Sequence, residues 1–395
     1  MNNLARDISH VSSYTVRVLH PNDVEDGLLL AWADLEARAV VPNAFLSPYF
    51  VMPAIRYLES TSDVLMVFVE KAASGMKDLV GVGIFQVRRP TRQFPLMHLS
   101  TFTSIHSYLS GFLLDREHAG EALRMIYGYL TDGGCPWHGL YIDNCPAEHL
   151  LPDEMKEAAR DVGLKWTTFS SWERAVFHAA DFDGEIEAYL GKNQRKNYHR
   201  CVRNLKDQGM FEWRLVRGTE PLERNVDEFI RLENMGWKGR EETSLYSNAD
   251  HVSFFKEMIS GFNRVDRAYF TELSINGHVI SSTSNLISGR AGFGFKVGWD
   301  PEFSKYSPGV VNEIQTIEHV GEKLGDLDYI DSSASPDSYI SKIWTGRRAI
   351  VEGMFTFTPK GQAALAGVQI VKKIKNLLFI TLFQVWLEIP VVLVV

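Results

Sequence analysis

The most constraining feature of the sequence is the segment from residue 266 to residue 332, where the spacing of apolar residues changes abruptly. "RAYFTELSI" and "HVISSTSNLIS" are separated by Asn276-Gly277, a strong short signal for a two-residue hairpin turn. The next run, "AGFGFKVGW", alternates apolar residues with glycines and one lysine, which predicts a strand with one nearly bare face. Such a face lets a ligand or another backbone approach closely. After "DPEFSKYSPG" the apolar residues recur at helical spacing, so the segment predicts a hairpin, a third strand and a helix.

The turn that starts this helix has the composition of an anion site. Ser307 is suited to the N-cap and Pro308 to the first helical position, where its missing N–H costs nothing. Gly309 has no Cβ, and the free N–H groups of Gly309 and Val310 would point outward at the positive end of the helix dipole. Many Ser-Pro helix starts bind nothing. Because the glycine-faced strand leads directly to this turn, we interpret it as a candidate site for phosphate or another anion.

The remaining elements suggest two halves built on one plan. A strand "LDYIDSS", a short helical piece from Tyr339 to Trp344 and a strand "AIVEGMFTFT" follow the helix. The first half repeats this order without obvious identity, with strands at "SDVLMVFVE", "LVGVGIFQVRR" and "PLMHLSTFTS" and a helix from about Asp115 to Leu130. The order predicts an α/β chain with halves at 1–183 and 184–360 and an apolar tail at 361–395. No low-complexity linker lies between the halves, so we expect them to pack as one body.

Composition excludes several classes of function. A net charge of −8 and a pI near 5.9 argue against a general DNA or RNA binder, which is usually basic over its footprint. The three cysteines form no CxxC pair and the histidines show no ligand spacing, so no metal site is expected. HExxH, P-loop, EF-hand and Gly-x-Ser-x-Gly motifs are absent from the sequence. The N-terminus lacks the apolar core of a secretion signal, and a cytoplasmic location is expected.

Two segments depart from this average. Six basic residues crowd the segment from Lys192 to Lys206, which is either the solvated face of a connecting helix or a patch that attracts an anionic substrate or cofactor tail. From Leu377 to Val395 the chain is almost continuously apolar and follows Lys372, Lys373 and Lys375. This tail either packs against protein or touches the inner face of a membrane, and the sequence leaves both interpretations open.

Motifs spread from about residue 30 to residue 350 carry a family resemblance. They are "AWADLEARAVVPNAFLSPYF", "FIRLENMGWKG", "FKVGWDPEFSKYSPG" and "LDYIDSSASPDSYISKIW". In this order they resemble the CelD/BcsL-type branch of the GNAT acyltransferases, whose members carry two GNAT-like halves and are related in architecture to the FemAB peptidyltransferases. The resemblance implies tandem acyl-CoA N-acyltransferase halves with mixed, mostly antiparallel sheets flanked by helices. The glycine-rich Q/R-x-x-G-x-G/A loop usual in GNAT enzymes is replaced here by Tyr306-Ser307-Pro308-Gly309.

The resemblance and the positions of the residues together suggest roles for residues in the second half. It implies that an acyl-CoA donor such as acetyl-CoA is bound without a metal, by Lys296 and by Tyr306, Ser307, Pro308, Gly309 and Val310. Tyr339 would protonate the departing thiolate, Asp331 is the leading candidate for the base, and Lys342 would balance developing charge. Trp237 and Lys238 would form a wall of the acceptor site. Each has an ordinary alternative: a packed tyrosine or tryptophan, a capping aspartate, a solvated lysine.

The function expected from the sequence is therefore acyl transfer from acyl-CoA to an amine or hydroxyl of a saccharide or cell-envelope precursor, in exopolysaccharide production. A first alternative is a FemAB-like enzyme that takes an aminoacyl group from tRNA, with the Lys192–Lys206 segment holding RNA. A second alternative is a non-catalytic binding or scaffold protein that keeps the fold, which the missing glycine-rich loop would favour.

Overall fold

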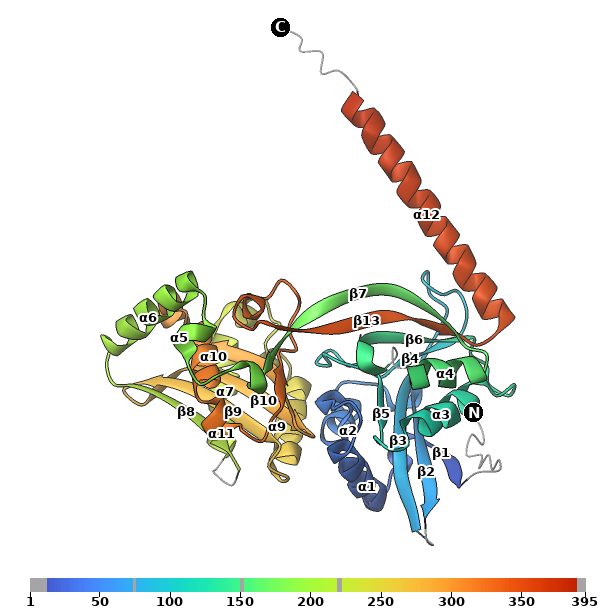
Figure 1. Cartoon of the computed structure of the whole chain (residues 1–395), viewed down its shortest axis with the longest axis horizontal. Helices are drawn as coiled ribbons and strands as arrows, with labels where there is room; N and C mark the ends of the chain where they lie inside the picture. Colours follow the sequence, from blue (N-terminus) through green and yellow to red (C-terminus); the bar gives the residue numbers. More distant parts are fainter. Residues whose placement is uncertain (1–12, 74–75, 150–152, 219–221, 389–395) are drawn as a thin grey trace.

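The computed structural model describes residues 13–73, 76–149, 153–218 and 222–388; the side chains of residues 73, 76, 154, 222, 237, 238 and 375–388 lie outside that description. Two lobes lie side by side, β7 and β13 arch from one to the other, and α12 projects away from both (Figure 1). One sheet runs through the described residues in the order β1-β2-β3-β4-β6-β13-β7-β12-β11-β10-β9-β8. The expected mixed, mostly antiparallel sheet flanked by helices is confirmed.

The first lobe contains the elements that the sequence predicts there and a few more. In chain order they are β1 (Tyr14–Leu19), α1 (Asp26–Ala37), α2 (Pro48–Tyr57), β2 (Val64–Ala73), β3 (Met76–Arg88), β4 (His98–Thr101), β5 (Phe112–Leu114), α3 (Ala119–Thr131), β6 (Gly139–Pro146), α4 (Asp153–Asp161) and β7 (Lys165–His178).

The second lobe begins with two helices. Its elements are α5 (Ile186–Tyr189), α6 (Lys192–Lys206), β8 (Phe211–Arg217), α7 (Leu222–Met235), α8 (Trp237–Arg240), α9 (Ala249–Asn263), β9 (Ala268–Ile275), β10 (His278–Ser288), β11 (Ala291–Trp299), η7 (Pro301–Tyr306), α10 (Pro308–Glu318), α11 (Val320–Lys323), β12 (Tyr329–Asp331), η8 (Tyr339–Lys342) and β13 (Gly346–Thr356). The Asn276-Gly277 hairpin is confirmed, with φ of 51° and 76° at its two residues. The predicted long helix is interrupted at His319 into α10 and α11.

The two halves exchange their last strands. β13 belongs to the second half in sequence, yet it lies between β6 and β7 and pairs antiparallel with both. β7 ends the first half and pairs at its far end with β12 of the second. The predicted boundary near residue 183 thus follows the strand that ties the halves together.

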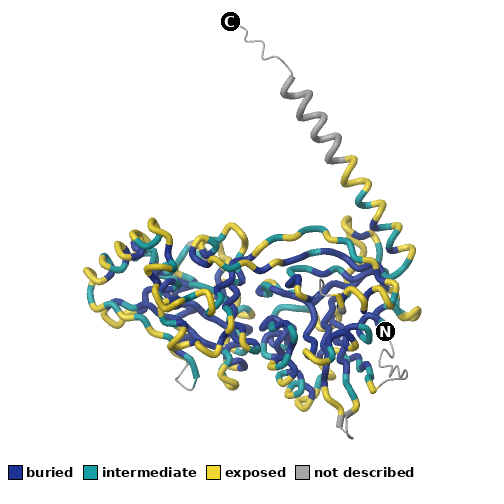
Figure 2. The backbone as a smooth tube through the Cα atoms, in the orientation of Figure 1, coloured by how far each residue is buried: buried dark blue, intermediate teal, exposed yellow. Residues whose placement is uncertain are grey.

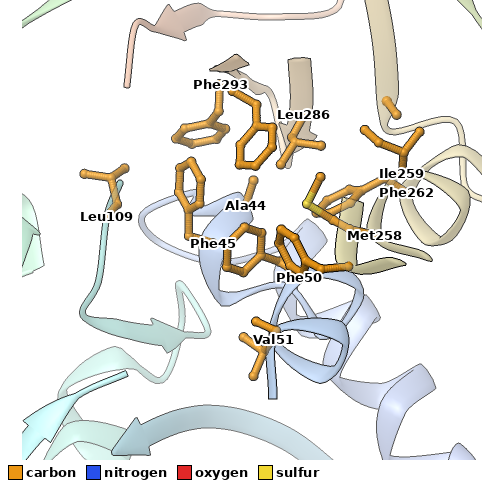
Figure 3. Packing of buried hydrophobic residues seen from close by; sticks show 14 of the residues in the cluster. Ala44, Phe45, Phe50, Val51, Leu109, Met258, Ile259, Phe262, Leu286 and Phe293 are labelled. Atoms are coloured by element: carbon orange, nitrogen blue, oxygen red, sulfur yellow. The ribbon is translucent and has the colours of Figure 1, made fainter. Parts of the chain in front are cut away.

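A shared hydrophobic core also joins the halves. Phe45 and Phe50, near the start of α2, pack edge-on against Phe293 and Phe254 of the second half, with ring centroids 6.0 and 5.4 Å apart. Figure 3 shows Phe45, Phe50 and Phe293 converging with Met258 in one cluster. Buried segments likewise run through both lobes in Figure 2. The expectation that the halves pack as one body is borne out.

One expectation about β11 is wrong. Its glycines and lysine do not form a single bare face, because Lys296 pairs with Ser284 and Gly294 with Asn285, which leaves Phe295 as an extra residue in a bulge. Beyond the bulge Lys296 and Gly298 face α7, where a Cβ at Gly298 would lie 2.6 Å from the Glu233 nitrogen. That glycine serves helix packing.

Helix α12 (Pro359–Glu388) starts against β13 and then leaves the body (Figure 1). Of the tail predicted at 361–395, the almost continuously apolar segment at 377–395 lies outside the description: the side chains are not described up to residue 388, and nothing is described beyond it. Among the described residues, no helix has the length and apolar character needed to cross a bilayer.

Candidate active site

The fork between β11 and β12 opens the largest part of the candidate site. The two strands pair in parallel over Ala291–Phe293 and Tyr329–Asp331, and then β12 ends while β11 continues to Trp299. A cavity of about 440 Å³ lies beyond this point. Its walls come from β11 after the fork, the serine-rich loop after β12, η8 and α10. We call it the central cavity.

A smaller cavity of about 210 Å³ lies at the start of α10 and is called the anchor cavity. It is lined by Ser307, Pro308, Gly309 and Val310, which the sequence singled out, and it shares Val297 and Tyr339 with the central cavity. The two cavities are therefore neighbours along β11. A donor whose anionic end lay at the helix start would have its other end beside the fork.

The turn at this helix start differs in one detail from the expectation. Ser307 is the N-cap and Pro308 opens the helix, as predicted, but Ser307 adopts a left-handed conformation (φ 51°, ψ 53°). Within the described part of the chain its side chain accepts no capping hydrogen bond. A side chain that caps the helix would compete with a ligand for the first-turn amides. Because the Ser307 side chain makes no such bond with a described residue, it does not compete with a ligand there.

Glu313 places a carboxylate in the central cavity, and the sequence analysis missed it. The residue lies on α10 one turn after Val310 and lines the cavity wall. Among the described residues, none gives its carboxylate a hydrogen bond or an ion pair. Burial raises the pKa of Glu313 to about 7. A glutamate at the border of an apolar helical face was the available signal in the sequence.

Tyr339 lines both cavities from η8, with 39% of its surface exposed. Desolvation of the phenol raises the pKa of Tyr339, and the nearby charge of Glu313 raises it further. The phenol therefore keeps its proton at neutral pH, while the carboxyl group opposite is poised to gain or lose one. Such a pair with separated pKa values suits acid–base chemistry.

Lys296 lines the central cavity at the bulge, but its ammonium group is turned toward α7. It lies 4.0 Å from the fully buried carboxylate of Glu233 and 5.7 Å from the ring centroid of Phe295. Burial lowers the pKa of Lys296, and the charge of Glu233 partly offsets this effect. The lysine is thus already paired below the cavity wall.

Asp331 lies outside both cavities. Its carboxylate is fully buried, accepts a 2.9 Å hydrogen bond from Arg348 and lies 3.7 Å from Arg174. The same side chain accepts a hydrogen bond from the backbone N–H of Ser333, which lines the central cavity. This is the environment of a fixed structural charge.

The other residues singled out in the sequence lie in varied places. Lys342 is exposed at the end of η8 and lines neither cavity. Tyr306 is buried in the core of the second half, beneath the Lys305 ammonium 4.8 Å from its ring. The side chains of Trp237 and Lys238 lie outside the described residues, although α8 carries their backbone.

The corresponding fork in the first half is filled by the chain itself. β4 and β6 pair in parallel over Leu99–Ser100 and Leu140–Tyr141. Beyond that point Ser110 donates its backbone N–H to the Asn144 carbonyl and its hydroxyl to the Asp143 carbonyl. The same loop sends Tyr108 into the wall of the central cavity. The first half thus contributes to the second half's cavity.

The basic helix α6 packs against α10 and η7. Tyr198, Cys201 and Leu205 form its buried side. Its basic side chains are largely exposed; Arg195 lies 3.5 Å from Glu187, and Arg200 donates to Asn197. A cationic surface thus lies on a helix that packs against α10 and η7.

Comparisons with known proteins agree with this geometry. Residues 192–339 match the family model described as Acetyltransferase (GNAT) domain. The fold is similar to the crystal structure of FemX (TM-score 0.56, 10% identity, 86% of this chain and 97% of that one). It is also similar to the C-terminal domain of a putative lysylphosphatidylglycerol synthetase from Agrobacterium fabrum (TM-score 0.52, 11% identity, 86% of this chain and 93% of that one). A third similar structure is that of a conserved protein of unknown function from Bacteroides thetaiotaomicron. Its TM-score is 0.53 at 8% identity, over 85% of this chain and 98% of that one.

Among curated proteins none matches this sequence. At such low identities the similar structures report the fold alone, whereas the family model covers the strands and the helix start that border both cavities. Residues 192–339 are therefore similar to a GNAT acetyltransferase domain, and the whole chain has a fold similar to that of FemX.

Proposed function

We propose that the protein is an acyltransferase that moves an acyl group from acyl-CoA to a primary amine. One observation carries the proposal: the anchor cavity, at a helix start, lies beside a larger cavity that holds the phenol of Tyr339 and the carboxylate of Glu313, which no described residue pairs. Direct acyl transfer requires a site that binds the anionic end of the donor, a channel that holds the thioester, and an acid–base pair.

The donor would lie along the fork. The amides of the first turn, after Ser307, would bind its pyrophosphate, and the exposed cations of α6 would attract its anionic tail. Its thioester would lie between β11 and the serine-rich loop, where backbone N–H groups beyond Gly294 polarise the carbonyl. A Cβ at Gly294 would come 3.1 Å from the Ser332 carbonyl oxygen, so the glycine keeps this part of the fork narrow.

Glu313 and Tyr339 divide the proton transfers in this proposal. Glu313 takes a proton from the bound ammonium group, which leaves a neutral amine. The amine nitrogen forms a bond to the thioester carbon, and the carbon–sulfur bond then breaks. Tyr339 donates its proton to the departing thiolate and regains one from the nitrogen of the new amide. The products are the amide, free CoA and one proton on Glu313 that passes to solvent.

The acceptor would carry its amine on a polar, hydroxylated body. Ser332, Ser335, Ser338 and Thr283 line the central cavity together with Asn285, and these neutral groups can exchange hydrogen bonds with hydroxyl groups. An amino sugar or another saccharide precursor of the cell envelope fits this lining, and exopolysaccharide production is the setting that the CelD/BcsL-type resemblance implies. A cytoplasmic location remains part of the proposal.

Calorimetric titration with acetyl-CoA and longer acyl-CoAs tests the donor. We expect 1:1 binding, and release of free thiol when glucosamine is added but not when glucose is added. Glucosamine carries an amine at the position where glucose carries a hydroxyl group, so the comparison distinguishes an amine acceptor from a hydroxyl acceptor. Absence of binding by every acyl-CoA would instead support the non-catalytic scaffold alternative.

A second candidate, an aminoacyl-tRNA-dependent transferase, is favoured by the exposed basic face of α6, a helix that packs against α10 and η7. It predicts that activity requires charged tRNA. Reversing Arg195, Arg200 and Arg203 to glutamate would then abolish activity, whereas a CoA-dependent enzyme would lose donor affinity and keep its maximal rate.

A further inference from the structure

Helix α12 leaves the folded body after its first two turns. Leu365 is buried against Met354 and Phe94 and fixes the start of the helix. Farther on, Ile370, Val371 and Ile374 are 57%, 52% and 50% exposed. Figure 2 shows this part of α12 as exposed and separated from both lobes. Large apolar side chains gathered on a projecting helix mark an interaction surface.

The exposed part of α12 is amphipathic. At about 100° per residue, helical geometry puts Ile370, Val371 and Ile374 within one arc of about 100°. Lys373 falls on one flank of this arc, and Lys375, whose side chain lies outside the described residues, occupies the position on the other flank. Lys372 is on the back of the helix, with its ammonium 5.8 Å from the ring centroid of Phe169. The apolar arc therefore faces away from the body.

The sequence of α12 becomes more apolar beyond this stretch. From Leu377 to Leu387 it holds no charged residue, and it includes two phenylalanines and a tryptophan. A short amphipathic stretch flanked by lysines and continued by an apolar helix is the pattern of a segment that lies in a lipid interface. There, lysines lie at the level of the headgroups and extend their ammonium groups into water.

We propose that α12 docks the protein on an anionic lipid surface, with Ile370, Val371 and Ile374 in the interface and Lys373 at the phosphates. Charge complementarity selects this occupant. In a parallel pair of α12 helices the lysines of both copies would meet at one level and repel, whereas anionic headgroups attract them. The inference goes beyond the proposed acyl transfer and does not depend on it.

Vesicle flotation of the full chain tests this inference. We expect the protein to float with vesicles of phosphatidylcholine and phosphatidylglycerol at 7:3, and at least about tenfold less with phosphatidylcholine alone. Changing Lys373→Gln and Lys375→Gln together should weaken binding to the anionic vesicles by about tenfold or more. Raising the salt from 0.15 to about 1 M should weaken it in the same direction, because the screening length falls.

Variants of the apolar arc and a matched control complete the test. Ile370→Ser with Ile374→Ser should abolish flotation, while the circular dichroism spectrum and the unfolding midpoint stay like those of the parent protein and show that the fold is intact. Lys360→Gln, an exposed lysine in the first turn of α12, should float like the parent protein. A parent chain that stays out of the anionic vesicles overturns the proposal. The proposal is also overturned if sedimentation shows that the parent protein is a dimer, that the Ile374→Ser variant is a monomer, and that neither binds lipid.

Discussion

Arg348 donates a 2.9 Å hydrogen bond to Asp331, and both side chains are buried beneath the strands that join the two halves. Arg348 lies on β13 and Asp331 at the end of β12, so the pair spans the strand exchange. Arg174 on β7 approaches the same carboxylate and donates to the carbonyl of Tyr108. The buried charge of Asp331 thus connects residues from both halves that surround the central cavity.

Asp331→Asn tests whether this carboxylate is structural. Removing one partner from a buried ion pair leaves the arginine charges uncompensated, and the free energy of unfolding should fall by about 3–5 kcal/mol. Urea unfolding followed by circular dichroism measures the loss. Asp328→Asn is the control, because its pair with Arg290 is largely exposed and should contribute little. Unchanged stability together with lost activity would return Asp331 to the role of base.

Glu313→Gln tests the proposed base. In the parent enzyme kcat/KM should rise with pH through about 7, because the carboxyl group must be ionised to accept a proton. The glutamine variant should lose at least about 100-fold in kcat and also lose this limb of the pH profile, while its affinity for acyl-CoA stays within about threefold. Stopped assays of thiol release across pH 5 to 9 give both values.

Glu322→Gln is the matched control for this change. It removes the same charge from the same region, but from an exposed side chain on α11 that pairs with Lys323. Its pH profile should overlie that of the parent enzyme. If Glu313→Gln keeps a profile with a limb near 7, another group is the base.

Local sequence signals predicted the elements that border the site. Asn276-Gly277 specifies its hairpin because both residues tolerate positive φ, and Ser307-Pro308 fixes a helix start through rules that involve a few neighbouring residues. These predictions needed no knowledge of the rest of the fold. They located the strand and the turn that line both cavities.

Non-local relationships were beyond the sequence. The bulge at Phe295 leaves the apolar alternation of β11 unchanged in sequence and yet turns Lys296 toward Glu233. Asp331 stands at a strand end, where bases are often found, and its two arginines arrive from distant strands. Glu313 looks like a surface residue until η8 and Tyr108 close the cavity around it.

Glu36→Gln tests another buried carboxyl group, on α1. Burial raises the pKa of Glu36 to about 7 although Arg267 lies 3.6 Å away. The folded state therefore binds this proton more tightly than the unfolded chain, and the free energy of unfolding should fall as pH rises from about 4.5 to about 7. The glutamine variant should be more stable than the parent at pH 8, by up to about 3 kcal/mol, and similar to it at pH 4. Denaturant unfolding curves of both proteins at the two pH values measure the difference in the free energy of unfolding. A parent protein whose free energy of unfolding increases over this pH range would contradict the prediction.

Gly309→Asp and Gly309→Asn together test the anchor cavity. A Cβ at Gly309 would meet only ordinary contacts, 3.7 Å from Trp299 and Val297, so a side chain can start there without a clash. An aspartate in the first turn stabilises the free helix through its dipole, yet it repels a phosphate at the same amides. Acyl-CoA should bind the aspartate variant at least about tenfold more weakly than the isosteric asparagine variant, while both melt no lower than the parent. Equal affinities in calorimetric titration would place the donor's phosphates away from Ser307–Val310, because an aspartate at the first-turn amides would repel a phosphate bound there.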